Sequence, residues 1–496
     1  MRRALALFLV LSLVAVACSD DSGEDSGGGL GRLLDSAASE DPGSDDEPAD
    51  DAPADSGAID WQDGGDGWQQ GYLEVPLDHD DPEGPTIDIA VVPLLINPGG
   101  PGAAGIEYAY YGELLFDDEI LERFDIVGFD PRGVGASTQV TCGDDEFFDE
   151  FTAADPVPDS PEERAEVQVL VEEFAANCDA ESGDLLPYLD TVSTAKDMDL
   201  IRQALGDDQI TYLGFSYGTF LGATYLELFG EHTRAAVLDG AYSRSLTPLE
   251  MTQGQAIGFE RTLDAFLASC RAEGCTYAGG DDPEVALFSI LESIDAQPIP
   301  VDDRELTVGL AWTGVIQALY SELAWPSLDE ALSEARFDGD GTGLISLADD
   351  YNDRSSDGSY DNSNAAFVTI SCSDGESTEG LSDEDAAAQV LAAAPRIGPV
   401  FTAMPGPCDY WPFEPDPPTG PWSAPDAPPV LVIATTGDPA TPYEWGVRAA
   451  DELETATLLT VEGDSHTAYW GGNGCVDDAV DAYLLDLTVP AEGARC

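Results

Sequence analysis

The chain has 496 residues, of which 98 are Asp or Glu and 18 are Lys or Arg, so its formal net charge is −80. Hydrophobic residues make up 43% of the chain, which is enough to bury a large core and excludes an acidic chain that never folds. The charge excludes nucleic acid as a partner, because phosphate contacts need a basic surface. It also argues against electrostatic docking on an anionic membrane.

The acidic residues are spread over the whole chain. Residues 19–60 hold 14 of them, so most lie in the part that can fold, and Lys196 is the only lysine. Self-repulsion at this density destabilises a compact state, and salt screens it. We therefore expect adaptation to high salt. An acidic proteome without a salt requirement is the alternative.

The first residues are typical of an export signal. Two arginines precede the apolar stretch Ala4–Ala17, which is too short to span a bilayer. Small residues then lead into Cys18, as in bacterial lipoprotein signals, where this cysteine becomes the lipidated N-terminus. We predict an extracytoplasmic protein anchored at the cell surface through Cys18, with simple secretion as the alternative. Residues 19–60 are rich in Gly, Ser, Pro and Asp and are predicted to be a disordered acidic tether.

The cysteines support export. Eight remain after Cys18, and an even number in an exported chain predicts disulfides. Pairing of neighbours along the chain is the simplest arrangement: 142–178, 270–275, 372–408 and 475–496. No Cys or His cluster has zinc spacing, so we expect neither a metal nor a cofactor.

Short apolar runs bounded by Gly, Pro or Asp alternate with helical patterns from Trp61 onward. The runs are Leu94–Asn97, Phe124–Phe129, Ile210–Phe215, Ala235–Leu238, Val430–Ala434 and Leu458–Val461. This alternation predicts an α/β fold with a mostly parallel sheet and helices on both faces. Between residues 245 and 405 amphipathic helical patterns replace it. The predicted organisation is a core of residues 61–244, a helical lid of residues 245–405 and a second core segment of residues 406–496.

One motif has the form of a nucleophile turn. Residues 214–218 read G-x-S-x-G around Ser216, after the apolar run Ile210–Leu213 and before a helical pattern. That strand–turn–helix context exposes a serine hydroxyl at the end of a sheet. In a glycine-rich chain this motif alone is weak evidence for a nucleophile, and an ordinary Gly-Ser turn is the alternative.

A serine nucleophile needs a base, and the chain has three histidines: His79, His232 and His466. His466 follows the apolar run Leu458–Val461, and Asp438 follows the run Val430–Ala434. The order Ser216, Asp438, His466 is that of the α/β-hydrolases, with both partners just beyond strand ends. We predict that His466 moves the proton and that Asp438 orients its imidazole.

A glycine-rich segment, Asn97–Gly102, directly follows the first of these runs. Acyl transfer needs main-chain N–H groups aimed at the developing oxyanion, and glycines let the backbone come close. We predict that the N–H groups of Gly100 and Tyr217 are the donors. A phosphate cradle is the alternative, disfavoured because no Lys-Ser/Thr follows.

Several segments resemble the actinobacterial tripeptidyl-aminopeptidase group, exported α/β-hydrolases related to prolyl aminopeptidases. They are Asn97–Gly102, Phe124–Ser137, Tyr212–Gly218, Gly437–Pro442 and the C-terminal stretch Cys475–Leu484. The resemblance implies an α/β-hydrolase fold with an inserted helical lid. It also implies an exported serine exopeptidase that removes short N-terminal peptides. The segment before Asn97 is shorter than in the group, which implies that about one strand is missing at that edge of the sheet.

An aminopeptidase must bind a free α-ammonium group, so carboxylates from the lid should face the substrate. Asp374 and Glu250 are our candidates, and solvated surface acids are the alternative reading of both. Two other functions remain open. One is a carboxylesterase or lipase with the same triad, and the other is a binding lipoprotein on an inactive hydrolase scaffold.

Overall fold

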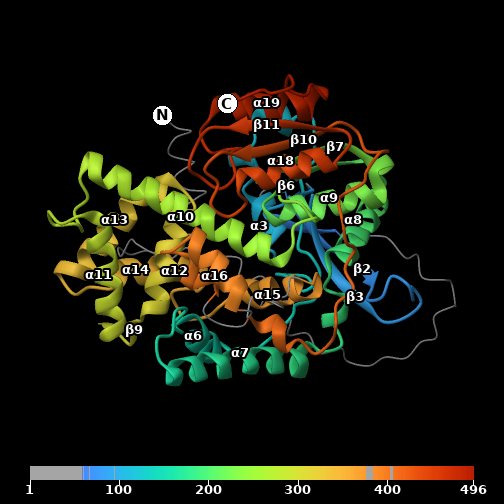
Figure 1. Cartoon of the computed structure of the whole chain (residues 1–496). Coiled ribbons are helices and arrows are strands. Elements are labelled where there is room, and N and C mark those ends of the chain that lie inside the picture. The colour runs from blue at the N-terminus through green and yellow to red at the C-terminus, as the bar shows by residue number, and fades with distance from the viewer. Residues whose placement is uncertain (1–58, 60, 66–67, 94, 376–383, 403–405) are drawn as a thin grey trace.

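A computed structural model describes residues 59, 61–65, 68–93, 95–375, 384–402 and 406–496 (Figure 1). The predicted signal of residues 1–18, with Cys18, and nearly all of the predicted tether lie outside the described residues. Among the helices that are described, none combines the length and the apolar character needed to cross a membrane.

The described residues form one sheet of nine strands, in the order β1-β2-β3-β5-β4-β6-β7-β10-β11. The strands are β1 (Gln62–Gly65), β2 (Trp68–Pro76), β3 (Thr86–Pro93), β4 (Ile96–Asn97), β5 (Val127–Phe129), β6 (Ile210–Phe215), β7 (Thr233–Asp239), β10 (Val430–Thr435) and β11 (Ala456–Val461). Pairing is antiparallel from β1 to β5 and parallel from β5 to β11. This confirms the predicted α/β-hydrolase fold.

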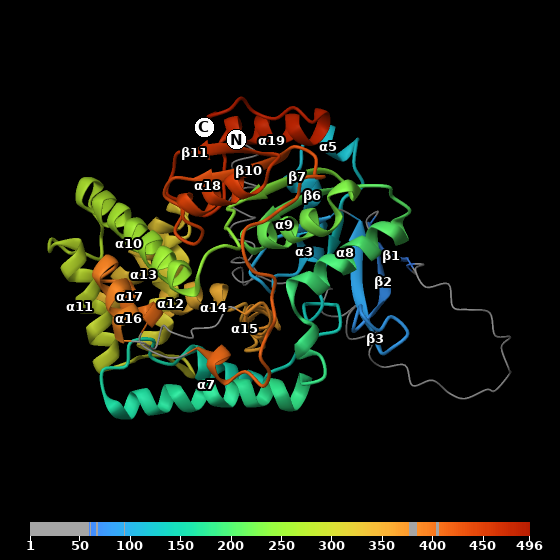
Figure 2. The same cartoon turned by 45° about the vertical axis from the view of Figure 1, so that its right-hand side comes forward.

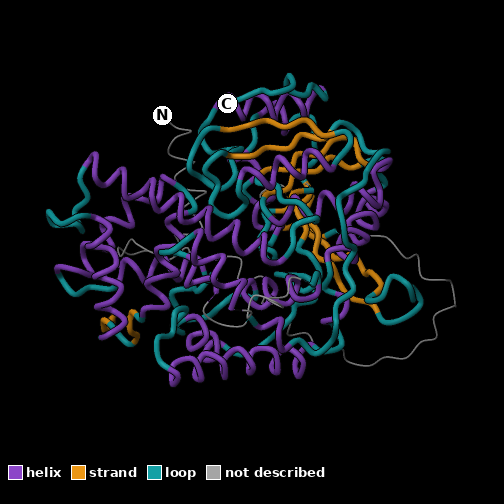
Figure 3. The backbone as a smooth tube through the Cα atoms, viewed as in Figure 1, coloured by secondary structure: helices purple, strands orange, loops and turns teal. Residues whose placement is uncertain are grey.

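Helices cover both faces of the sheet, because the central strands are apolar on both sides. Leu213, Val237 and Ile433 pack on one face, whereas Tyr212 and Leu238 pack on the other. The helices of the first face are α3 (Gly105–Tyr110), α4 (Gly112–Leu115), α5 (Asp118–Leu121) and α19 (Gly474–Asp486); those of the second are α8 (Thr191–Leu205), α9 (Tyr217–Phe229) and α18 (Tyr443–Glu452). Figure 3 shows the strands as one twisted layer between these helices.

The chain leaves the sheet after β7 and builds the helical lid before it returns in β10. The lid helices are α10 (Pro248–Glu273), α11 (Pro283–Ala296), α12 (Val308–Leu319), α13 (Trp325–Phe337), α14 (Thr342–Tyr351), α15 (Ser363–Ser373), α16 (Glu384–Ala393) and α17 (Gly398–Thr402), with a small hairpin β8 (Ile299–Val301) and β9 (Arg304–Leu306). Most of these helices share a hydrophobic core of their own, separate from those of the sheet. Figures 1 and 2 show the lid beside the sheet in both views.

A second excursion, between β5 and β6, extends the helical layer. It contains α6 (Asp145–Thr152) and α7 (Pro161–Ser182), which run along the lower edge of the lid (Figure 1). The Thr307 hydroxyl donates to the Ala153 carbonyl at 2.8 Å, and the Arg354 guanidinium contacts Asp149 at 2.7 Å. Our predicted boundary at residue 245 assigned this whole region to the core. Helices α6 and α7 contact lid residues, and their buried side chains, such as Phe147 and Phe174, belong to the same hydrophobic cluster as residues of the sheet.

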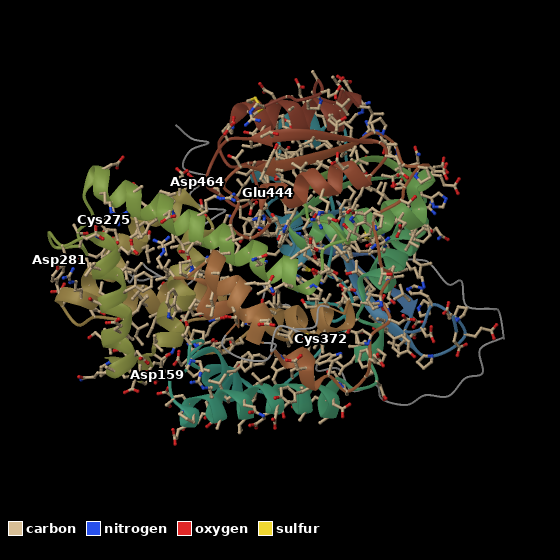
Figure 4. All side chains as sticks on the ribbon, viewed as in Figure 1. Asp159, Cys275, Asp281, Cys372, Glu444 and Asp464 are labelled. Atoms are coloured by element: carbon tan, nitrogen blue, oxygen red, sulfur yellow. A yellow bond between two sulfur atoms is a disulfide. The ribbon has the colours of Figure 1, made fainter. Side chains whose placement is uncertain are left out.

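All four predicted disulfides are confirmed: Cys142–Cys178, Cys270–Cys275, Cys372–Cys408 and Cys475–Cys496. Figure 4 labels Cys275 at the lid periphery and Cys372 on α15. The segment before Asn97 is short, as its sequence indicates: β3 ends at Pro93 and β4 begins at Ile96. The β2–β3 hairpin is present, and β3 joins the sheet through β5, although few residues separate β3 from β4.

Candidate active site

Ser216 lies at the sharp turn between β6 and α9. Its backbone has φ 52° and ψ −122°, a conformation that L-residues rarely adopt and that marks a strained turn. The flanking glycines allow this turn. A Cβ on Gly214 would lie 2.4 Å from the Gly218 carbonyl, and a Cβ on Gly218 would lie 2.6 Å from the Asn97 carbonyl. Both glycines of the G-x-S-x-G motif are therefore required by close backbone packing.

Asp438 and His466 are in direct contact. Asp438 is fully buried in the loop after β10, and each of its carboxylate oxygens lies 2.9 Å from Nδ1 of His466. The N–H groups of Ala440 and Thr441 also donate to Asp438, at 3.0 and 2.8 Å, which fixes the carboxylate. Burial lowers the pKa of His466, but the charge and hydrogen bond of Asp438, with the charge of Asp239, outweigh it, so that the pKa is raised.

Ser216 and His466 line one cavity of about 610 Å³ between the strand ends and the lid. Phe215 and Trp470 line it from the sheet side, and Tyr320 lines it from the lid. Asp464, on the loop that carries His466, also lines it and is labelled in Figure 4 where the sheet faces the lid. The structure thus gathers the three predicted triad residues at one place. Serine, imidazole and carboxylate in this arrangement are suited to nucleophilic acyl transfer.

The glycine-rich loop lies directly against the serine turn. A Cβ on Gly99 would lie 2.6 Å from the Phe215 carbonyl and 3.0 Å from Cβ of Ser216. Gly100 follows with φ +98°, and Tyr217 is the first residue of α9, where main-chain N–H groups point out of the helix end. Tyr217 therefore directly follows Ser216, and Gly99, the neighbour of Gly100, contacts the serine turn.

The other two histidines lie away from the cavity, and each contacts a carboxylate. Nε2 of His79 lies 2.9 Å from Asp197, which also binds the fully buried Arg132 of the Asp-Pro-Arg-Gly segment. Nδ1 of His232 lies 3.0 Å from Asp199. The contact between Arg132 and Asp197 gives the Asp-Pro-Arg-Gly segment a structural role.

Neither predicted substrate-binding acid lies among the residues that line the cavity. Asp374 accepts hydrogen bonds from the N–H and the hydroxyl of Thr191, at 2.7 and 2.6 Å, and so ties α15 to α8. Glu250 caps the start of α10 through Thr247 and contacts Arg448 at 3.3 Å. Both carboxylates hold elements together, which favours a structural role over binding of the substrate amine.

Other carboxylates line the cavity instead: Glu107 on α3, Asp350 on α14, and Asp353 and Asp361 in the loop after it. Burial, together with the charge of Asp361, raises the pKa of Asp353 to about 7. Burial, with the charge of Asp349, raises that of Asp350 to about 6, and burial also raises the pKa values of Glu107 and Asp361. Nothing in the sequence separates these four from the other acids of the chain, because α3, α14 and the loop after α14 come together only in the folded protein. The described residues contain no cluster of His, Cys, Asp and Glu suited to a metal ion.

Known proteins match most of the chain. A family model described as "TAP-like protein" matches residues 394–496, and one described as "alpha/beta hydrolase fold" matches residues 92–277. Serine protease Hip1 of Mycobacterium tuberculosis is 38% identical over 454 residues, which cover 86% of each chain. Carboxylesterase B of the same species is 37% identical over 445 residues, 86% of this chain and 85% of that one. Tripeptidyl aminopeptidase of Streptomyces lividans is 31% identical over 472 residues, 88% of this chain and 86% of that one.

Proposed function

Since the chain belongs to the tripeptidyl-aminopeptidase group of α/β-hydrolases and is a serine hydrolase, we propose that it is an exported exopeptidase that releases short peptides from free N-termini. One observation carries the exopeptidase assignment. Seven carboxyl groups line the same cavity as Ser216 and His466, and burial raises the pKa values of four of them, Glu107, Asp350, Asp353 and Asp361.

In the proposed mechanism Ser216 attacks the scissile carbonyl while His466 takes the hydroxyl proton. The N–H groups of Gly100 and Tyr217 stabilise the oxyanion. His466 then returns the proton to the leaving amine, and an acyl-enzyme forms at Ser216. Water, deprotonated by His466, hydrolyses this ester and restores the serine. Asp438 stabilises the imidazolium in both halves of the cycle, which its contact at 2.9 Å supports.

The carboxylates select the amine. A carboxylate held in a poorly hydrated cavity is stabilised by a cation, and a peptide's α-ammonium supplies one. The charge of Asp361 contributes to the raised pKa values of both Glu107 and Asp353, and the charge of Glu107 contributes to that of Asp353. These three carboxylates therefore lie close together, and in our proposal they surround the ammonium subsite. A substrate anchored there by its N-terminus reaches Ser216 only a fixed number of residues later, which limits the length of the peptide that is released.

Carboxylesterase activity is the second candidate, and two observations favour it. Carboxylesterase B is 37% identical to the chain, and apolar side chains such as Phe215, Leu115 and Leu323 also line the cavity. An ester substrate needs no ammonium group. A binding protein on an inactive scaffold is disfavoured by the contact between Asp438 and His466.

A substrate panel on the full chain tests the proposal. It contains aminoacyl and tripeptidyl nitroanilides, their N-acetylated copies and nitrophenyl esters. We expect the free tripeptidyl nitroanilides to give the highest kcat/KM and the acetylated copies to be poor substrates. Equal kcat/KM with and without the acetyl group would reject the exopeptidase and leave the serine hydrolase. Turnover of esters alone would favour the carboxylesterase.

Export is part of the proposal. Four disulfides are typical of an oxidising compartment outside the cytoplasm. We propose that Cys18 carries a lipid anchor at the cell surface. Expression of the full chain and of Cys18→Ala in a bacterial host tests this: the native chain should partition into detergent and the variant should not. Equal partitioning would instead favour secretion without an anchor.

A further inference from the structure

Asp239 is the last residue of β7. This strand lies in the sheet between β6, which leads to Ser216, and β10, which leads to Asp438. Its register partners are Phe215 in β6 and Ile433 in β10. Its main-chain carbonyl accepts the N–H of Ser216 at 2.9 Å. A main-chain hydrogen bond therefore attaches the strained turn at Ser216 to Asp239.

The carboxylate of Asp239 reaches the other half of the site. Its Oδ2 accepts the N–H groups of Ala468 and Tyr469, at 3.0 and 2.7 Å, on the loop directly after His466. The next residue, Gly240, lies against the imidazole, because a Cβ there would be 3.2 Å from Cε1 of His466. The side chain of Asp239 is fully buried, and Oδ1 accepts no hydrogen bond from the described residues.

Charge couples Asp239 to the imidazole. Burial raises the pKa of Asp239 to about 6, while two N–H groups and the charge of His466 oppose the shift. Asp438 and Asp239 both raise the pKa of His466. The rings of Tyr320 and His466 meet edge to face at 5.6 Å. Across the cavity are the carboxyl groups of Glu107, Glu322, Asp350, Asp353 and Asp361, and Glu462 and Asp464 precede His466 on its own loop.

A purely structural anchor for two N–H groups does not need a charge. A neutral amide oxygen accepts the same bonds without the cost of burying a carboxylate with an unpaired oxygen. The charge has a use only when a cation forms beside it. In a serine hydrolase that cation is the imidazolium produced as the nucleophile attacks.

We propose that Asp239 is a positioning residue of the reaction: its carbonyl holds the N–H of Ser216, and its carboxylate holds the loop of His466 and supplies a second negative charge to the imidazolium. The inference rests on the proposed serine mechanism and not on the nature of the substrate. Asp239 touches neither the substrate nor the reacting atoms, and it acts through the two residues that do.

The test uses Asp239→Asn in the full chain, with Asp130→Asn as the matched control. Asp130 directly follows β5, burial raises its pKa to about 6, and its carboxylate accepts two N–H groups, from Ile106 and Ala136. Its carboxylate accepts no hydrogen bond from His466 or from the loop after it. Both variants lose a buried carboxylate that accepts two N–H groups, so each carries a cost in folding, and only the carboxylate of Asp239 lies beside the loop of His466.

The readout is the rate of labelling by a fluorophosphonate as a function of pH, which needs no knowledge of the substrate. We expect Asp239→Asn to lower the plateau rate by about tenfold and to move the acid midpoint down by about half a pH unit or more. In Asp130→Asn we expect the midpoint of the native chain. An unchanged midpoint in Asp239→Asn, or an equal shift in both variants, would overturn the proposal.

Two further measurements keep the result decisive. Melting temperature reports whether each variant is folded, and Asp239→Ser replaces the amide if that variant is not. The three histidines give few enough imidazole signals for a direct NMR titration of His466. We expect its pKa to fall in either neutral variant.

If the native chain is labelled but cleaves no peptide, the exopeptidase proposal fails while this inference stands. If the native chain is not labelled at all, the serine mechanism and this inference both fail.

Discussion

The main-chain N–H of His466 donates to the carbonyl oxygen of Tyr320, 2.8 Å away, although Tyr320 belongs to the lid. The two rings also meet edge to face, with their planes at 74°. The base of the predicted triad is therefore held from both sides, by Asp438 on the sheet and by the end of α12 on the lid. Displacement of α12 would also displace the imidazole.

We predict that Tyr320→Ala lowers kcat/KM by about tenfold, because the imidazole loses the ring that fixes its orientation. Tyr320→Phe keeps the ring and should stay close to the native value. Steady-state kinetics of both variants on one substrate check this. Equal losses in the two variants would show that the hydroxyl, which bonds Tyr351, matters rather than the ring.

Ser216→Ala should abolish turnover and fluorophosphonate labelling while the melting temperature stays within a few degrees of the native value. The small methyl group fits where the hydroxyl was, and the backbone strain is unaltered. Mass spectrometry of the labelled chain locates the modified residue. Labelling that persists in Ser216→Ala would exclude Ser216 as the nucleophile.

The sheet and the proximity of Ser216, Asp438 and His466 were predictable because their signals are local. Central strands are continuous apolar runs, and Asp438 and His466 come directly after two of them. With three histidines in the chain, few triads were possible. The four disulfides were predictable because each joins successive cysteines.

The remaining features depend on contacts between distant segments. Helix α7 buries only a few residues, such as Phe174 and Cys178, so its sequence does not indicate that it runs along the lid. Glu107 and Asp353 meet because α3 and the loop after α14 face the same cavity. The contact between Asp374 and Thr191 was not predictable either, because Thr191 lies 183 residues earlier, at the start of α8. Among 98 acids, only the fold separates those that line the cavity from those that cap helices.

The preference for a free amine should depend on pH. Because burial and the charge of Asp361 raise the pKa of Asp353 to about 7, this carboxyl becomes neutral as the pH falls below that value. The ratio of kcat/KM for a tripeptidyl nitroanilide to that for its acetylated copy should therefore decrease from about pH 7.5 to about pH 5.5. The ratio cancels the titration of His466, which both substrates share.

Asp353→Asn should lower that ratio by about tenfold or more at neutral pH, since an amide replaces a charged partner of the ammonium. Asp464→Asn is the matched control, because Asp464 lines the cavity from the opposite, sheet side (Figure 4). A ratio that is constant with pH and equal in both variants would remove the ammonium subsite from this part of the cavity.

Salt should stabilise the protein. With a net charge of −80 and one lysine, repulsion between carboxylates opposes folding, and the Debye length falls to about 3 Å at 1 M salt. We expect the melting temperature and kcat/KM to rise between about 0.05 M and about 1 M NaCl. Thermal unfolding in NaCl and in an equal concentration of sucrose separates screening from a general solute effect. A flat profile in NaCl would favour an acidic composition without a salt requirement.

Mild acid should also stabilise the fold, against the usual trend for carboxylates. Asp130, Asp239 and Asp353 have folded-state pKa values raised to about 6, about 6 and about 7. Between the unfolded value of about 4 and these values the native state binds more protons than the unfolded chain, so the free energy of unfolding falls as pH rises. His466, with a raised pKa, acts in the same direction. The melting temperature should therefore be higher at about pH 5.5 than at about pH 7.5, and the opposite order would contradict the buried, protonated carboxyls.

Each of the four disulfides joins a cysteine to the next one along the chain. No loop closed by one bridge encloses a cysteine of another, so the pairs can form strictly in the order in which the polypeptide emerges. A chain that enters an oxidising compartment from its N-terminus can then oxidise each pair as it appears, and every bridge made between the two newest thiols is the native one. Maturation of this protein should accordingly need an oxidant but little help from a disulfide isomerase, in contrast to proteins whose bridges cross.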